Sequence, residues 1–308
     1  MRIILFGHQN WGVKAIEAIL NTRHELIHVF THPEDYDKNE KVWYSSVEES
    51  CKKNDIPFSI CTKIEKDDSE KIRNLKPDLI MSIGWRRLIP KSVFQIPRFK
   101  TINLHDGLLP QYRGFAPINW AIINGETEIG VTIHYIDESA DTGDIILQKQ
   151  ITIDNEKTAK EAYDELLDLS STMIHQTIEL IENGNVVTKK QKPNEGFFCS
   201  RRFPEDGKIN WNESRTDIFN LIRALSDPYP NAYCNFNEKI IHIKKARLTD
   251  QDFRGPPGRI CSINDDGIVV TCGMDFKKNQ GLLISQISIN NQIINPKDFF
   301  TKLWSKVE

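Results

Sequence analysis

Two side chains with complementary chemistry stand two positions apart where an apolar run ends. Asn103 and His105 alternate with apolar residues in the pattern of a buried strand, and side chains two apart on a strand point to the same face. Asp106-Gly107 and Pro110 then end the regular structure and begin a loop. An imidazole exchanges protons near neutral pH, and an amide can donate a hydrogen bond to a developing oxyanion. The pair suits catalysis, while hydrogen bonding within an ordinary turn is the alternative.

A second polar stretch, residues 137–144, lies between the strand-like runs 130–136 and 145–151. It contains four acids, one glycine and no large apolar residue. We expect a carboxylate of this loop to meet His105 in space. There it would fix the tautomer of the imidazole and raise its basicity.

The elements that must position these residues follow an alternating pattern. Residues 3–6, 26–30 and 79–83 read as buried strands, and residues 13–20, 45–54 and 67–75 have the character of helices. This alternation predicts an α/β domain with a Rossmann-like, doubly wound parallel sheet. Thr158-x-x-Glu161 is a capping box that predicts a long helix ending near Asn183-Gly184. Gly7 and Gly12 lack the G-x-G-x-x-G pattern, so a tight turn is favoured over a phosphate-binding loop.

A change of composition predicts two domains. The charged segment 189–193 reads as a solvated linker, and beyond it residues 214–225 form an amphipathic pattern that Pro228-Tyr229-Pro230 ends. Short strand-like runs follow, separated by turns such as 255–258 and 265–267. We expect a catalytic domain at 1–188, a linker at 189–205 and a smaller β-barrel-like (OB-like) domain at 206–308.

Composition bounds the class of protein. The 308 residues carry a net charge of -3, so no global basic field favours nucleic acid or an anionic membrane. The six cysteines form no C-x-x-C pair, which favours a reduced compartment and predicts no metal. The apolar run at 3–6 is too short for a signal peptide, and no run approaches the roughly 18 apolar residues of a membrane helix. We expect a cytoplasmic protein.

Three separated motifs resemble one family. They are Asn103-x-His105, then Leu108-Leu109-Pro110-x-Tyr112-Arg113-Gly114, and later Asp141-x-Gly143. Their order and spacing are similar to those of the formyltransferases that use N10-formyltetrahydrofolate, the superfamily of methionyl-tRNA formyltransferase. Within it the chain most resembles the nucleotide-sugar N-formyltransferases, such as the formyltransferase domain of the bifunctional UDP-4-amino-4-deoxy-L-arabinose enzyme. The likeness extends through residues 125–132 and 201–230.

The resemblance implies a reaction and a set of catalytic roles. A formyl group would pass from N10-formyltetrahydrofolate to the primary amine of an amino sugar carried on UDP, dTDP or GDP. Such enzymes serve the biosynthesis of cell-surface glycans, including lipopolysaccharide O-antigens. His105 would be the general base or proton shuttle, Asp141 would orient and support it, and Asn103 would stabilise the oxyanion. A homodimer is also expected.

The resemblance also implies binding residues. Those expected at the folate are Arg87, Leu88, Ile89, Leu108, Leu109, Pro110, Asp137, Glu138, Ser139 and Ala140. Those expected at the acceptor are His8, Trp11, Tyr112, Arg113, Gly114, Arg201, Arg202, Ile209, Trp211, Arg223 and Tyr229. For the segment 84–90 the alternative is a solvated rim, and for Trp211 it is a structural position between domains.

Other acceptors stay open. A methionyl-tRNA formyltransferase would share the first domain and the triad of Asn103, His105 and Asp141. Residues 32–41, however, hold four acids against two lysines, which disfavours contact with phosphates. A formyltetrahydrofolate hydrolase often carries an extra N-terminal domain, which we do not expect because the first strand starts at Arg2. A folate sensor without turnover is disfavoured by the intact triad. Asp106-Gly107 replaces the small residue and serine of many relatives, and Phe115 replaces an arginine of the arabinose enzyme, which indicates a different sugar.

Overall fold

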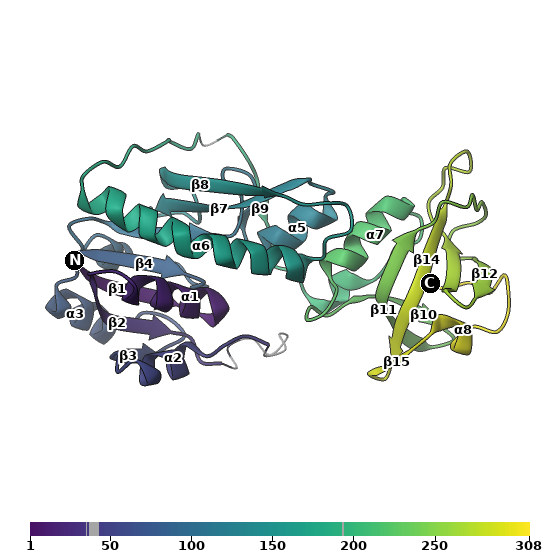
Figure 1. Ribbon diagram of the computed structural model, residues 1–308, viewed down its shortest axis with the longest axis horizontal. Coiled ribbons are helices and arrows are strands. Elements are labelled where there is room, and N and C mark those ends of the chain that lie inside the picture. The colour runs from purple at the N-terminus through teal and green to yellow at the C-terminus, as the bar shows by residue number, and fades with distance from the viewer. Residues whose placement is uncertain (35, 37–42, 193) are drawn as a thin grey trace.

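The computed structural model describes residues 1–34, 36, 43–192 and 194–308 and consists of two domains (Figure 1). The first is built on a seven-stranded sheet in the order β3-β2-β1-β4-β5-β7-β8. Its strands are β1 (Arg2–Gly7), β2 (Glu25–Thr31), β3 (Phe58–Ile60), β4 (Leu79–Ile83), β5 (Thr101–His105), β7 (Glu128–Tyr135) and β8 (Ile145–Thr152). The predicted α/β fold is confirmed.

Two strands depart from the parallel arrangement. β1 to β5 are parallel, whereas β7 runs antiparallel to β5 and β8 antiparallel to β7. The connection from β7 to β8 is the polar loop that begins at Asp137, and it is too short for the crossover that a parallel pair needs. The reversal brings this loop back to the end of β5.

Helices cover both faces of the sheet. They are α1 (Gln9–Leu20), α2 (Val47–Lys53), α3 (Lys66–Leu75), α4 (Lys91–Phe94), α5 (Pro117–Ile123) and α6 (Ala159–Glu182). Alternate residues of β1 divide between the two sides: Ile3 and Leu5 pack with α1 and α6, while Ile4 and Phe6 pack with α3 and α4. The strand is therefore apolar at successive positions because both of its faces are buried. The predicted capping box of α6, Thr158 with Glu161, is confirmed.

The second domain is an antiparallel sheet in the order β10-β11-β14-β13-β12, with β15 paired to β14. Its elements are the 3-10 helix η1 (Pro204–Gly207), α7 (Arg215–Ala224), β10 (Ala232–Phe236), β11 (Lys239–Leu248), β12 (Ile260–Asn264), β13 (Gly267–Thr271), β14 (Gly281–Ile289), β15 (Gln292–Ile294) and α8 (Pro296–Phe299). The chain's last residues bond to both outer strands, through Glu308 with Asn235 and through Ser305 with Ile260. This tail gives the sheet its barrel-like character.

The connection between the domains is bonded to the first domain. Lys189 pairs with Ile145, and the short strand β9 (Phe198–Cys199) pairs with β6 (Arg113–Gly114). α5 and α7 lie side by side at the junction (Figure 1). The segment predicted as a solvated linker is thus attached to the catalytic part, and the proposed domain boundaries stay a prediction. No helix within the described residues has the length and apolar character to span a membrane.

Candidate active site

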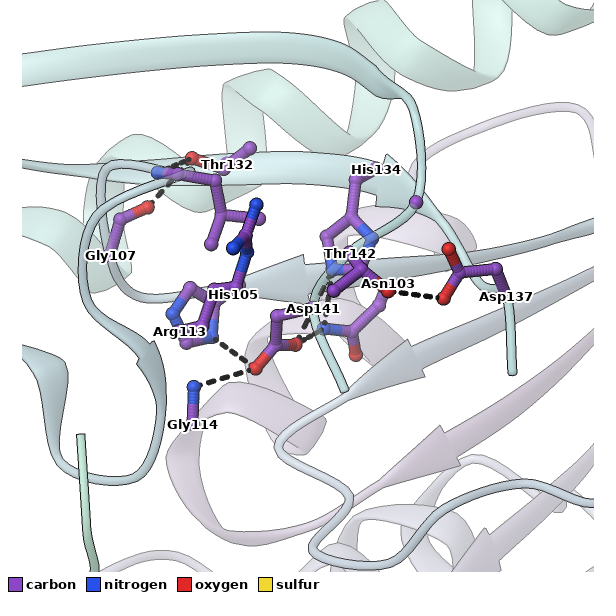
Figure 2. A network of polar contacts seen from close by, with 12 residues as sticks. Asn103, His105, Gly107, Arg113, Gly114, Thr132, His134, Asp137, Asp141 and Thr142 are labelled. Atoms are coloured by element: carbon purple, nitrogen blue, oxygen red, sulfur yellow. Dashed lines mark hydrogen bonds and ion pairs between the residues drawn. The ribbon is translucent and has the colours of Figure 1, made fainter. Parts of the chain in front are cut away.

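Strand pairing and a loop bring three side chains together. Asn103 and His105 project from β5 beside the paired strand β7, and the loop after β7 places Asp141 next to both. Asp141 Oδ2 lies 3.7 Å from His105 Nδ1, and Asp141 Oδ1 lies 3.4 Å from Asn103 Nδ2 (Figure 2). The prediction that a carboxylate of the 137–144 loop meets His105 is confirmed.

The tautomer of His105 is set by a backbone carbonyl. Its Nε2 lies 2.7 Å from the carbonyl oxygen of Tyr112, which can only accept, so Nε2 carries a hydrogen. Nδ1 is then the nitrogen that can take up a proton, and it faces Asp141. The expectation that the carboxylate fixes the tautomer is wrong, because Tyr112 does so. Asp141 is instead placed to stabilise the imidazolium that forms when Nδ1 is protonated.

The Asp141 carboxylate is held ionised in a strained position. Its backbone has a φ of 56°, and its Oδ2 accepts a hydrogen bond from the Gly114 N–H at 2.9 Å. Burial alone would raise the pKa of this carboxyl. His105, the contact with His134 and the Gly114 N–H outweigh burial and bring the pKa below its usual range. A negative charge therefore persists beside the imidazole at physiological pH.

A buried relay fixes the Asp141 loop. Gln191 Nε2 donates to the carbonyl oxygens of Asp141 at 2.9 Å and Gly143 at 2.7 Å, and Arg113 Nη2 donates to Gln191 Oε1 at 2.8 Å. Arg113 is only 2% exposed. Its expected contact with the acceptor is corrected, since its guanidinium supports the loop from within. Gln191 was missed because its partners are about 50 residues away and it lies in a charged stretch.

Two more polar residues missed in the sequence hold the loop after β5. Thr132 Oγ1 donates to the carbonyl oxygen of Gly107 at 2.7 Å, and Gln148 Nε2 donates to that of Leu109 at 2.8 Å. Leu109 is buried, while Leu108 and Pro110 are partly exposed. Of this trio, Leu108 and Pro110 keep side-chain surface for a ligand.

The two loops expected at the folate are joined by an ion pair between Lys91 and Glu138. Leu88 of the first loop is 68% exposed, an apolar side chain that a flat ligand would cover, whereas Ile89 is buried. Asp137 is used inside its own loop, where its carboxylate accepts from the Ser139 N–H and the Thr142 hydroxyl. Arg87 donates to the Tyr36 hydroxyl. Ser139 and Ala140 lie in the same loop.

The fit to a folate can be judged from these surfaces. A pterin presents a flat ring with polar edges, and the exposed Leu88 offers an apolar surface for the ring. Trp85, in the same 84–90 segment as Leu88, stacks on His32, and its Nε1 is buried and has no hydrogen-bond partner among the described residues. A buried donor without a partner is costly unless a ligand or water meets it. These loops therefore fit the group.

The residues expected at the acceptor divide into three sets. His8 and Trp11 are buried in an aromatic wall, where His8 contacts Tyr44 and Trp11 contacts Tyr163. Burial and then the nearby Arg86 lower the pKa of His8 to about 3, so it stays neutral. Tyr229 is partly exposed in the same wall, where it meets Trp43.

A second set lies beside β6, next to the triad. The Gly114 N–H donates to the Asp141 carboxylate, and the buried Tyr112 donates its hydroxyl hydrogen to the Glu126 carboxylate. Arg202 lies 4.6 Å over the Trp120 ring, and Arg201 lies 5.3 Å over Phe203. These arginines are on the segment that follows β9, and they remain candidates for the acceptor.

The third set has structural positions. Ile209 and Trp211 belong to the core of the second domain, where Trp211 is 5% exposed. Arg223 is buried and donates to the carbonyl oxygen of Lys157 at 2.9 Å, which ties α7 to the first domain. The expected ligand contacts of Ile209 and Arg223 are corrected, because these side chains are occupied by packing or by the domain junction. Trp211 is packed in the same core, although its Nε1 has no hydrogen-bond partner among the described residues.

A ring nitrogen that can take up a proton, an ionised carboxylate and an amide at the end of an α/β sheet can assist the transfer of an acyl-type group to a nucleophile. Comparison with known families identifies the group. Residues 1–178 match the formyl transferase family, and residues 202–303 match the formyl transferase C-terminal domain. The chain belongs to the formyl transferase family. It is an enzyme of the class that uses formyltetrahydrofolate.

Curated relatives and solved structures differ in what they act on. The methionyl-tRNA formyltransferase of Alkaliphilus oremlandii is 34% identical, with 90% of this chain and 89% of the relative covered. That of Clostridium acetobutylicum is 35% identical, with 88% and 87% covered. The Helicobacter canadensis N-formyltransferase, solved with folinic acid and dTDP-3-aminofucose, has a TM-score of 0.71 and 24% identity, with 92% and 98% covered. WlaRD, a sugar 3N-formyl transferase solved with dTDP and 5-N-formyl-THF, has a TM-score of 0.69 and 22% identity, with 95% and 98% covered.

Proposed function

We propose that this enzyme transfers the formyl group of N10-formyltetrahydrofolate to the primary amine of a nucleotide-linked amino sugar. His105, Asp141 and Asn103 are the catalytic residues of this proposal. The carrier is a UDP, dTDP or GDP group, and the product enters the biosynthesis of a cell-surface glycan.

The chain's own groups divide the work. When bound, formyltetrahydrofolate supplies the formyl carbon. His105 Nδ1 accepts a proton from the attacking amine and returns it to the leaving nitrogen, while Tyr112 holds the opposite side of the ring. Asp141 stabilises the imidazolium in between. Asn103 donates to the oxygen of the tetrahedral centre, a contact worth roughly 10²–10³ in rate in such sites.

The observation that carries the choice of acceptor is the arginine surface beside the triad. Cys199 pairs with Gly114, whose backbone N–H donates to Asp141. The next residue, Ser200, accepts a hydrogen bond from Trp120 Nε1, and Arg202 follows shortly after it in the chain. Burial, opposed by Asp206, lowers the pKa of Arg202, and its Nε is buried without a hydrogen-bond partner among the described residues. A guanidinium stacked on a tryptophan with a donor to spare suits a diphosphate.

The fold comparison supports the same acceptor. The two solved relatives described above were crystallised with dTDP or with a dTDP-linked amino sugar. The net charge of -3 also disfavours a large nucleic-acid footprint. The acidic character of residues 32–41 belongs to the same argument, although residues 35 and 37–41 lie outside the described part of the chain.

A second acceptor, the aminoacyl group of initiator tRNA, is favoured by the curated relatives. They are methionyl-tRNA formyltransferases at 34–35% identity over about nine-tenths of this chain. Both acceptors present a primary amine, so the triad chemistry is the same for either.

The experiment compares acceptors side by side with one folate donor. Initial rates are measured on a panel of UDP-, dTDP- and GDP-linked amino sugars and on methionyl-tRNA at low salt. Arg202→Gln should lower kcat/KM for the preferred nucleotide sugar by roughly 10- to 100-fold, the value of a charge-assisted hydrogen bond. Arg98→Gln is the matched control, because Arg98 also stacks on an aromatic ring but lies elsewhere. Formylation of tRNA at equal or higher efficiency would contradict the proposal.

A further inference from the structure

His134 lies against Asn103 and Asp141, and no step of the reaction described above is assigned to it. It stands on β7 opposite Asn103 in the strand register, and its ring is 2% exposed. The contacts of the ring come from the Tyr135 carbonyl, from Asn103 on β5 and from Asp141 in the loop (Figure 2). β8 faces it with the apolar Ile145. Asp141 and, across that carboxylate, His105 are the titratable groups that face it.

The hydrogens around His134 can be assigned one by one. Nδ1 lies 2.8 Å from the Tyr135 carbonyl oxygen, which only accepts, so Nδ1 carries a hydrogen. With no second proton, Nε2 is an acceptor, and the Asn103 Nδ2 at 3.2 Å donates to it. The other hydrogen of the same amide nitrogen reaches Asp141 Oδ1 at 3.4 Å.

This arrangement uses both hydrogens of the Asn103 amide inside the protein. The carbonyl oxygen of Asn103 then turns away from Asp141 and His134 (Figure 2). An oxyanion needs a donor, and in this orientation the amide nitrogen is already occupied by His134 and Asp141. Half a turn of the amide exchanges its two ends and places Oδ1 against both His134 Nε2 and Asp141 Oδ1. Three acceptors would then face one another unless Nε2 carries a hydrogen, which the Asn103 and Asp141 oxygens can share.

We propose that His134 is a positioning residue for formyl transfer, in which a proton on Nε2 turns the Asn103 amide and frees its N–H groups for the oxyanion. The inference rests on the role proposed above for Asn103. Asp141 Oδ1 lies 3.5 Å from Nε2 and supplies the opposite charge for the imidazolium. The proton stays on His134 through the cycle. The C–N bond to the acceptor forms, the bond to the folate nitrogen breaks, and the transferred proton passes through His105.

The kinetic test is the pH dependence of kcat, measured on whichever acceptor the enzyme turns over best. The parent should be active only in the form in which Nε2 carries a proton. His134→Gln carries an N–H near the same position at every pH, so its kcat should fall less toward alkaline pH. His134→Leu should lose up to roughly 10²–10³ in kcat, the worth of one oxyanion donor. His175→Gln is the matched control, because His175 bonds Ala18 on the far helix pair.

An alkaline limb that is identical in the parent and in His134→Gln would overturn the inference, and so would a His134→Leu variant within tenfold of the parent. A second readout needs no acceptor. In ¹⁵N-histidine-labelled enzyme bound to 5-formyltetrahydrofolate, both ring nitrogens of His134 should carry a proton under the conditions in which the enzyme is active. A ring with one protonated nitrogen throughout would refute the role of the proton. Because this signal needs only folate, a different acceptor would leave it unchanged.

Discussion

Replacing Asp141 by asparagine removes one charge and also the oxygen that accepts from the Asn103 amide at 3.4 Å. Asparagine tolerates the φ of 56° found at this position, and its side-chain oxygen can still accept the Gly114 N–H. The larger loss is the attraction between the carboxylate and a protonated His105, whose Nδ1 lies 3.7 Å from Asp141 Oδ2. At an effective dielectric constant of about 20, two unit charges at this separation attract by about 4 kcal/mol. Since about 1.4 kcal/mol corresponds to tenfold in rate, kcat should fall by about 10³.

The assay is release of tetrahydrofolate at saturating donor and acceptor, with thermal melting of each variant to show that it folds. Asp144→Asn is the control, because it removes the same charge from the same loop. The KM for the folate should change far less than kcat, as the interaction arises only when the imidazole is charged. An Asp141→Asn variant that keeps more than a tenth of the parent kcat would refute the stabilising role of the carboxylate.

Three further outcomes follow from the same geometry. The lowered pKa of Asp141 means that its ionisation stabilises the fold at pH values above the ordinary pKa of 3.8, and this contribution is lost as pH falls through the lower folded-state pKa. Urea unfolding at several pH values should show that the difference in free energy of unfolding between the parent and Asp141→Asn shrinks below about pH 4. A difference that does not depend on pH would contradict this expectation. Gln191→Ala leaves buried carbonyls without donors, at about 1–3 kcal/mol, and should lower both the melting temperature and kcat, whereas the exposed Gln150→Ala should change neither. Gly143→Ala would bring a Cβ to 1.8 Å from the Tyr135 carbonyl oxygen, so it should melt well below the parent, and equal melting would show that the loop gives way freely.

The parts of the fold with local signals could be predicted from the sequence. The paired apolar faces of β1, the capping box at Thr158 and the Asn103–His105 spacing each depend on residues close together in the chain. The antiparallel turn into β8 could not be predicted in the same way, because strand direction follows from pairing across the sheet.

The candidate site divides along the same line. Residue types predicted that a carboxylate would reach His105, but the Tyr112 carbonyl that sets the tautomer is a backbone group and leaves no mark in the sequence. Gln191 and His134 were missed because their roles depend on partners brought together by folding. The residue types arginine and tryptophan do not by themselves distinguish a binding position from a structural one. Arg202 lies on an aromatic surface, while Arg223 and Trp211 are buried in structural positions.

The destination of the formyl group tests the central proposal most directly. Donor folate labelled with ¹³C in the formyl group is given to the enzyme together with the best nucleotide-linked amino sugar and methionyl-tRNA, and the products are separated and identified by mass spectrometry. We predict that the label appears as an N-formyl group on the nucleotide sugar. Label recovered mainly on methionyl-tRNA, or as free formate, would contradict the proposed acceptor.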